Sequence, residues 1–188
     1  MALRNAVMAA LLEGEASGYD LAKGFDASVA NFWMATPQQL YRELERMEAA
    51  GLISARVVLQ EKRPNKRLFS LTEAGLAAIH AYTAEHPSKP TTIRDELMVK
   101  VQSVDAGDVG AVRAGIAERL DWARAKLARY ERVQARILDG RTEEQHLAEA
   151  ERIGPYLTLL RGMAFERENI RWSEAALKAL SARTAFHG

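Results

Sequence analysis

Hydrophobic residues recur at intervals of three and four along most of this chain, which is the spacing of one buried helix face. A clear early example is the segment from Pro37 to Ala50, where Leu40, Leu44 and Met47 form a single apolar stripe. Such a stripe packs against a core, while the opposite side of the helix faces outward. The pattern therefore predicts a mainly α fold.

The first part of the chain combines helical patterns with two short strand-like runs. We expect these elements at residues 3–12, 18–25, 37–50, 52–59, 67–71 and 73–84. A polar turn containing Pro64 and Asn65 joins the two strands into a hairpin. Three short helices followed by a hairpin and a fourth helix are typical of a winged helix-turn-helix, in which the two-stranded β-hairpin is the wing.

Helix starts are marked by side chains that can cap open backbone N–H groups, each with a partner three positions later. Pro37 reinforces one of these starts, because its missing N–H costs nothing at the first helical position. Gly51 closes the same helix. The five pairs are Ser17 with Asp20, Thr36 with Gln39, Thr92 with Asp95, Asp105 with Asp108, and Thr142 with Gln145.

A segment containing Pro87 and Pro90 divides the chain, because each proline removes a backbone donor and interrupts a helix. We therefore expect a winged helix-turn-helix domain over residues 1–85, a linker over 86–92, and an all-helical dimerisation domain over 93–188. No strand-like alternation follows the linker.

The second domain contains an apolar seam from Val109 to Ile137, which at 1.5 Å per residue predicts a helix of roughly 45 Å. A second segment, Glu143 to Ala182, carries a complementary seam. Gly154–Pro155 should either start a new helix or kink the existing one, and we favour a kink because the hydrophobic pattern continues across it. Paired helices of one chain leave apolar faces uncovered, which favours a homodimer. The residues expected in the dimer interface are Val109, Val112, Ile116, Leu120, Trp122, Leu127, Tyr130, Leu157, Leu160, Phe165 and Trp172.

Charge is distributed unevenly, although the net charge is only +1. The wing carries four cations within residues 62–67, whereas acidic residues concentrate elsewhere, notably on Glu43, Glu45 and Glu48. Local positive charge suits contact with phosphates. The polar face of the third helix adds side chains that can read base edges in a major groove. These side chains are Gln38, Gln39, Arg42 and Arg46.

Several short motifs are specific enough to indicate a family. They are Ser-Gly-Tyr-Asp-Leu at 17–21, Phe-Trp at 32–33, Gln-Leu-Tyr-Arg-Glu-Leu at 39–44, Gly-Leu-Ile at 51–53 and Leu-Thr-Glu-Ala-Gly at 71–75. In these motifs the chain resembles the PadR family. Residues 157–180, with Leu-Arg-Gly at 160–162, Phe-Glu-Arg at 165–167 and Trp172, resemble the virulence-activator-like domain of the AphA-type subgroup.

The resemblance implies a homodimeric transcriptional regulator that binds a near-palindromic operator through its recognition helix and wing. That the regulator is a repressor is implied by the family alone. The residue pattern and the resemblance together predict contact between double-stranded DNA and Tyr19, Lys23, Thr36, Gln38, Gln39, Tyr41, Arg42, Arg46, Lys62, Arg63, Asn65, Lys66 and Arg67.

Other classes of function find little support in the sequence. Neither an enzyme nor a cofactor is expected, because no arrangement of nucleophile, base or metal ligands stands out. The histidines are too dispersed for a metal site and are expected at the surface. The chain has no cysteine, no apolar run near the ~20 residues of a membrane span and no signal-peptide pattern, which predicts a cytoplasmic location. The histidines are His80, His86, His146 and His187.

Two alternatives stay open. A winged helix can dock a partner protein instead of DNA, although such a module has no electrostatic reason to keep a basic wing. A small-molecule effector could bind among Trp122, Tyr130, Tyr156 and Phe165, but aromatic residues in such places more often form a core. Core packing is also the interpretation for Phe25, Phe32, Trp33 and Phe69.

Overall fold

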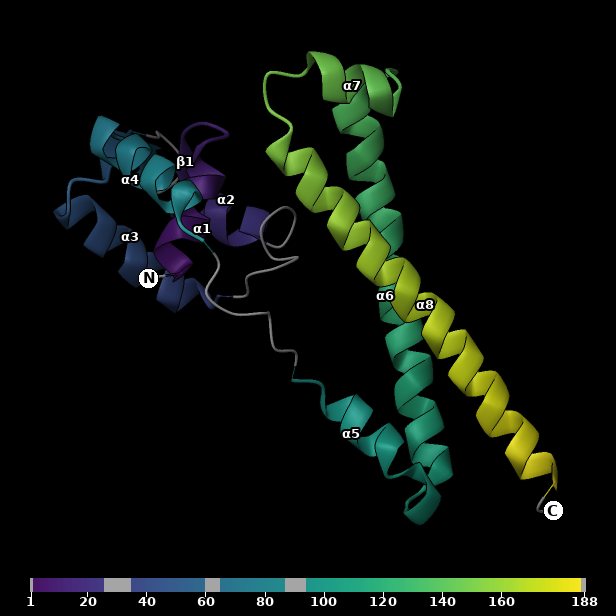
Figure 1. The fold of residues 1–188 in the computed structure, drawn as a ribbon. Coiled ribbons are helices and arrows are strands. Elements are labelled where there is room, and N and C mark those ends of the chain that lie inside the picture. Colours follow the sequence, from purple (N-terminus) through teal and green to yellow (C-terminus); the bar gives the residue numbers. More distant parts are fainter. Residues whose placement is uncertain (1, 26–34, 60–64, 87–93, 187–188) are drawn as a thin grey trace. The chain divides into compact units, whose positions relative to one another are not determined.

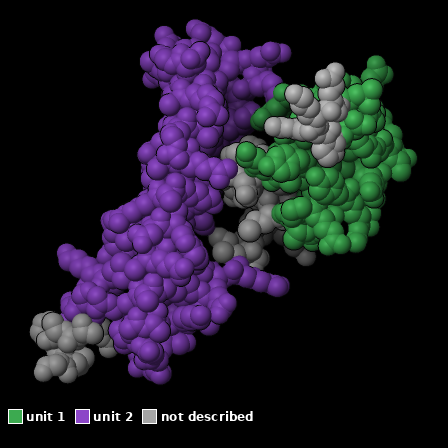
Figure 2. All heavy atoms as spheres, turned by 180° about the vertical axis from the view of Figure 1, so that it is seen from behind, with its two compact units in different colours: residues 1–90 green, residues 91–188 purple. Residues whose placement is uncertain are grey.

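The structure is a computed structural model that describes residues 2–25, 35–59, 65–86 and 94–186. Two compact units, residues 1–90 and 91–188, make up the chain (Figure 2). The expected mainly helical fold is confirmed. The expected linker lies almost entirely outside the described residues, so the domain boundaries stay a prediction.

The first unit is a winged helix-turn-helix (Figure 1). Its elements are α1 (Ala2–Leu11), β1 (Ala16–Ser17), α2 (Gly18–Phe25), α3 (Pro37–Ala49), β2 (Ile53–Val58), β3 (Lys66–Leu71) and α4 (Glu73–Ala84). The sheet is antiparallel in the order β1-β3-β2, and Ile53 is paired with Leu71. The sequence pattern does not predict β1, because two residues are too few to show an alternation.

Helices α1, α2 and α3 pack with the sheet around one apolar core. The expected inward stripe of α3 is confirmed, and Phe69 joins it as predicted. Phe32 and Trp33 lie outside the described residues. Gly51 ends α3 with φ near +69°, a conformation that glycine adopts without steric cost. The buried side chains of this core are Ala6, Val7, Met8, Leu11, Leu21, Leu40, Leu44, Met47, Ile53 and Phe69.

The second unit is a helical hairpin with short flanking helices. Its elements are α5 (Glu96–Gln102), the 3₁₀ turn η1 (Val104–Ala106), α6 (Val109–Leu138), α7 (Glu143–Glu149) and α8 (Gly154–Phe186). Helices α6 and α8 lie side by side, and α5 lies beside α6 (Figure 1). The predicted seam of α6 is largely buried, from Val112 and Ile116 to Tyr130, and Tyr156, Leu159 and Met163 of α8 are buried in the same hairpin.

Of the two outcomes expected at Gly154–Pro155, the favoured kink is wrong and the start of a new helix is confirmed. Helix α7 ends at Glu149, Ala150 has an extended backbone conformation, and α8 begins as a separate helix at Gly154. The physical reason is proline itself, which cannot donate to the preceding turn but fits the first turn of a new helix. The continuous hydrophobic pattern therefore spans two helices.

Three of the five predicted caps are confirmed, at Ser17, Thr36 and Thr142. The cap expected at Asp105 is wrong, because Asp105 lies in η1 and the Asp108 carboxylate accepts the hydrogen bond that starts α6. Thr92 lies outside the described residues, and Asp95 is the residue that caps α5. Asp105 and Asp108 are three residues apart, so the capping motif alone does not show which of the two starts α6.

Candidate nucleic-acid interface

The start of α3 is fixed by two reciprocal hydrogen bonds. The Thr36 Oγ1 accepts from the Gln39 N–H at 3.2 Å, and the Gln39 Oε1 accepts from the Thr36 N–H at 2.9 Å. Pro37 supplies the first helical position. This capping box satisfies N–H groups that a helix end otherwise leaves open, so the first turn of α3 is well defined.

The outward face of α3 is polar and accessible. Gln38, Arg42 and Arg46 are exposed, while the stripe on the other side of the helix is buried. Arg46 is the most constrained of the three, because its guanidinium lies 3.5 Å from the Glu43 carboxylate. The Gln39 side chain is also exposed, but its oxygen is already engaged in the cap. Only its amide N–H groups remain to donate elsewhere.

Helix α2 approaches α3 closely at its first residue. A Cβ atom at Gly18 would collide with the Tyr41 ring, so any larger residue at this position would displace that ring. Tyr19, the next residue, is 67% exposed, and Lys23 is exposed one turn later. Both of these residues, which are predicted to contact DNA, are therefore accessible to a ligand.

The wing is joined to the helices by ion pairs. Lys66 Nζ lies 2.7 Å from an Asp20 carboxylate oxygen, and Arg67 donates to both Glu48 oxygens at 2.7 and 2.8 Å. The Lys66 ammonium, with the Ser17 hydroxyl, holds the pKa of Asp20 below its ordinary value. Lys62 and Arg63, at the predicted tip, lie outside the described residues.

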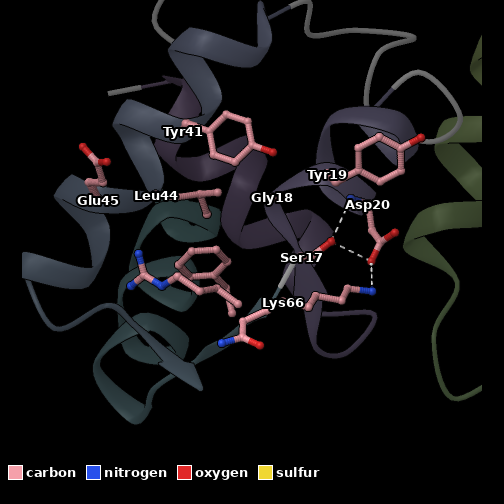
Figure 3. Close-up of a pocket in the computed structure, with 11 residues that line it drawn as sticks. Ser17, Gly18, Tyr19, Asp20, Tyr41, Leu44, Glu45 and Lys66 are labelled. Carbon is pink, nitrogen blue, oxygen red and sulfur yellow. Dashed lines mark hydrogen bonds and ion pairs between the residues drawn. The ribbon is translucent and has the colours of Figure 1, made fainter. Parts of the chain in front are cut away.

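These elements surround an open hollow of about 770 Å³ (Figure 3). Leu44 and Phe69 line it together with the Tyr41 ring, while Asp20 and Lys66 form an ion pair on the same wall. The hollow brings together five of the residues predicted to contact DNA, whereas Lys23, Gln38, Arg42 and Arg46 do not line it. The five are Tyr19, Tyr41, Asn65, Lys66 and Arg67.

Acidic residues lie beside the wing, which corrects the expectation that they concentrate elsewhere. Glu48 binds Arg67, and Glu45 lines the same hollow as Lys66. Asp20 was assigned only a capping role, but it also binds Lys66. The helical period places Glu45 and Glu48 on the same side of α3. Only the tertiary fold shows that the wing lies beside that side.

The second unit exposes several large apolar side chains. Of the residues predicted in a dimer interface, Trp122 is 66% exposed, and Leu157 and Phe165 are also exposed. Phe165 and Trp172 line a shallow hollow of about 1140 Å³ with residues of α5 and α6. The others are half-buried or buried within the hairpin itself: Val109, Val112, Ile116, Leu120, Leu127, Tyr130 and Leu160.

His146 is buried, so its expected surface position is wrong. Its ring packs 4.9 Å from the ring of Tyr156, because α7 turns this side of its short helix toward the start of α8. Among the described residues, no group of three potential metal ligands comes together. No helix within the same residues is long and apolar enough to cross a membrane.

Comparisons with known proteins identify both units. Residues 7–81 match the transcriptional regulator PadR-like family, and residues 93–181 match the family described as virulence activator alpha C-term. The chain is 31% identical over 194 residues to the probable transcriptional regulator Rv1176c of Mycobacterium tuberculosis, covering 96% of this chain and 98% of that protein. It is 27% identical to the negative transcriptional regulator PadR of Bacillus subtilis, covering 93% and 95%.

Solved structures agree with these matches. The crystal structure of B. subtilis PadR in complex with operator DNA has a TM-score of 0.76 and 25% identity, covering 96% of this chain and 99% of that one. The same protein in complex with p-coumaric acid shares the fold, with a TM-score of 0.69 and 24% identity over the same shares. The Vibrio cholerae virulence activator AphA has a TM-score of 0.67 and 28% identity, again over 96% and 99%.

Proposed function

Since this chain belongs to the PadR-like family of transcriptional regulators, we propose that it binds operator DNA as a homodimer. Helix α3 enters the major groove, and the wing formed by β2 and β3 follows the neighbouring backbone. The observation that carries this proposal is the position of Gln38 and Arg42. They are exposed on the first two turns of a capped helix whose other face is buried in the core.

Specific readout falls to the outward face of α3. Arg42 suits a guanine edge and Gln38 an adenine edge, because each can form two hydrogen bonds with its base. The Thr36 and Gln39 pair holds the helix start, whose dipole favours a nearby phosphate. Tyr19 and Lys23 of α2, Tyr41 and Arg46 of α3, and Asn65 of the wing contact the sugar-phosphate backbone around it.

The wing contributes affinity that does not depend on sequence. Lys66 and Arg67 lie at the start of β3, and Lys62 and Arg63, which are outside the described residues, precede them closely in the sequence, so this stretch of the chain carries four positive charges. Each phosphate neutralised by such a cation releases counterions, which makes binding depend on salt.

Dimerisation is proposed for the helical unit. The exposure of Trp122, Leu157 and Phe165 supports an interface there, because side chains of this size gain free energy when a second copy covers them. A two-fold dimer sets two recognition helices about one turn of DNA apart and so reads a near-palindrome. The seam that is buried within α6 and α8 then acts as the rigid support of the interface.

Two further features of the proposal rest on the relatives, and a third follows from DNA binding. B. subtilis PadR is a negative transcriptional regulator, which supports repression here. The p-coumaric acid complex of that protein supports a small-molecule effector, for which the hollow beside Phe165 and Trp172 is a candidate. A regulator of this kind acts in the cytoplasm, where the chromosomal DNA lies.

The wing can be tested by replacing Lys62, Arg63, Lys66 and Arg67 together with alanine. A matched control replaces Lys100, Arg132, Arg136 and Lys178 of the helical unit, which changes the net charge equally. Binding to duplex DNA is then measured over a series of salt concentrations. The wing variant should bind all sequences more weakly, and its logarithmic salt slope should be shallower by about 2 to 4 units, or about one unit for each removed cation that contacts a phosphate. A slope equal to that of the control contradicts the proposal, and no DNA binding by the unaltered protein favours a protein-docking module.

A further inference from the structure

Two of the four wing cations are already bound by carboxylates of their own domain. Lys66 lies 2.7 Å from Asp20 of α2, and Arg67 lies 2.7 Å from Glu48 of α3. Both acids belong to the helix-turn-helix, and both cations belong to β3. Each ion pair therefore joins the helix-turn-helix to the wing. Figure 3 shows the pair of Lys66 and Asp20.

Stability alone gives a weak reason for these pairs. The side chains of Lys66 and Asp20 are 37% and 49% exposed, and those of Arg67 and Glu48 are 49% and 34% exposed. Ion pairs that are this accessible contribute little to folding, because water and salt screen them. The same accessibility leaves each cation within reach of a phosphate, which would compete with the carboxylate for the same N–H groups.

We infer that Asp20 and Glu48 are internal competitors for DNA phosphate: they hold Lys66 and Arg67 in place and cancel part of the wing's charge until a correctly placed backbone displaces them. This inference rests on the proposed DNA binding and adds two positioning residues to it. These two cations then add little to the affinity for a random duplex, because each only exchanges its carboxylate partner for a phosphate.

The consequence for selectivity follows from charge. A displaced carboxylate stays close to the phosphate that replaced it and repels it. Contact by the wing is therefore favourable only where other contacts, such as those of α3, fix the phosphate at the right place. The two acids reduce binding to random DNA more than binding to an operator, which raises the ratio between the two affinities.

Glu45 provides a matched control. It lies on α3 and lines the same hollow as Lys66, so it contributes negative charge to the same surface. Within the part of the chain that the structure describes, its carboxylate forms no hydrogen bond or ion pair, whereas those of Asp20 and Glu48 do. Removing its charge weakens repulsion of DNA but frees no cation.

The experiment uses the full chain with Asp20→Asn, Glu48→Gln, the double variant and Glu45→Gln, and a random duplex a few helical turns long. Asparagine and glutamine keep the shape of the acids, and the amide oxygen introduced by Asp20→Asn can still accept from the Ser17 hydroxyl, as the Asp20 carboxylate does. Thermal unfolding identifies any variant that does not fold. If one fails, the other single variant still tests the inference.

Each freed cation adds about one phosphate contact, so the logarithmic salt slope should steepen by about 1 unit in each single variant and about 2 in the double variant. Glu45→Gln should raise affinity without changing the slope. Slopes that equal that of the unaltered protein, or an equal steepening by Glu45→Gln, overturn the inference. If the unaltered protein itself binds no duplex DNA, the proposed function fails instead, which is a separate result.

Discussion

Glu166 of α8 lies 3.0 Å from the ammonium of Lys126 on α6, and its side chain is only 6% exposed. Asn169, one turn further along α8, donates to the same carboxylate at 2.9 Å. A carboxylate that is withdrawn from water in this way needs its partners, because an unpaired buried charge is costly. The pair therefore ties α8 to α6 at one register.

Replacing Glu166 with alanine should destabilise the second unit by about 1–3 kcal/mol, because Lys126 loses its partner. The cost stays moderate because the Lys126 side chain is partly exposed to water. The double variant Lys126→Met and Glu166→Met should recover most of this loss, because it leaves neither charge unpaired. Urea unfolding followed by circular dichroism measures both changes.

The exposed pair between Arg124 and Glu174 joins the same two helices and serves as the control. Glu174→Ala should change the free energy of unfolding by no more than about 0.5 kcal/mol, since both side chains are about half exposed. Equal losses in Glu166→Ala and Glu174→Ala would show that burial does not distinguish the two pairs.

Much of this fold follows from local sequence signals. The stripe of Leu40, Leu44 and Met47 and the box of Thr36 with Gln39 predict where α3 lies, where it begins and which face is buried, because all of these depend on neighbours within one or two turns. The residues of the candidate interface on α3 follow from the same periodicity. Local information is sufficient there.

Features that depend on distant residues could not be predicted in the same way. The pairing of Glu48 with Arg67 joins residues 19 positions apart, and the burial of His146 depends on contact with Tyr156 across a chain reversal. The hydrophobic pattern could not show whether the helix kinks or a new one starts at Gly154, because an apolar seam continues in both cases. Tertiary contacts decide all three.

Arg42 gives a prediction about specificity. Replacing it with alanine should reduce discrimination between an operator and a variant with one altered base pair by about 1–3 kcal/mol, the contribution of a two-bond base contact. The operator is first identified by sequencing genomic fragments that the protein retains. Competition binding with single-base variants then measures the change.

Lys23→Ala is the matched comparison, since its proposed contact is to the backbone. It should weaken binding to every sequence by a similar factor. A uniform loss in Arg42→Ala as well would reassign Arg42 to a phosphate contact.

Trp122 gives a prediction about assembly. If a second copy covers this side chain, Trp122→Ala should weaken the dimer by about 2 kcal/mol for each Trp removed, and the change occurs twice in a symmetric interface. Light scattering over a dilution series should show the monomer at much higher protein concentration. Replacement of the exposed Tyr82 of the first unit should leave the dissociation constant unchanged, and no shift in Trp122→Ala would place the interface elsewhere.

Asp95 gives a prediction about pH. It caps α5 through the Leu97 N–H at 3.1 Å and accepts from the Arg119 guanidinium of α6 at 2.8 Å. The Arg119 hydrogen bond lowers the pKa of Asp95 in the folded protein, so the folded state favours the carboxylate. The resulting stability is fully present above the unfolded pKa of about 3.9 and is lost as pH falls through the lower folded pKa.

Asp95→Asn should therefore lower the thermal midpoint at neutral pH, and the difference from the unaltered protein should shrink below about pH 4. Calorimetry over a pH series measures this difference. Asp121→Asn, at an exposed position of α6, controls for loss of a nearby acid. A difference that stays constant across the series would mean that the Asp95 contribution does not depend on its charge.

The capping role of Gln39 limits how the protein can acquire a new operator. A substitution there alters the DNA-facing surface and also removes one of the two bonds that start α3, so a change in base preference brings a loss of helix stability. Gln38 and Arg42 do not take part in the cap. Evolution or engineering of a different target sequence should therefore proceed through these two positions, while position 39 changes only together with a compensating cap at position 36.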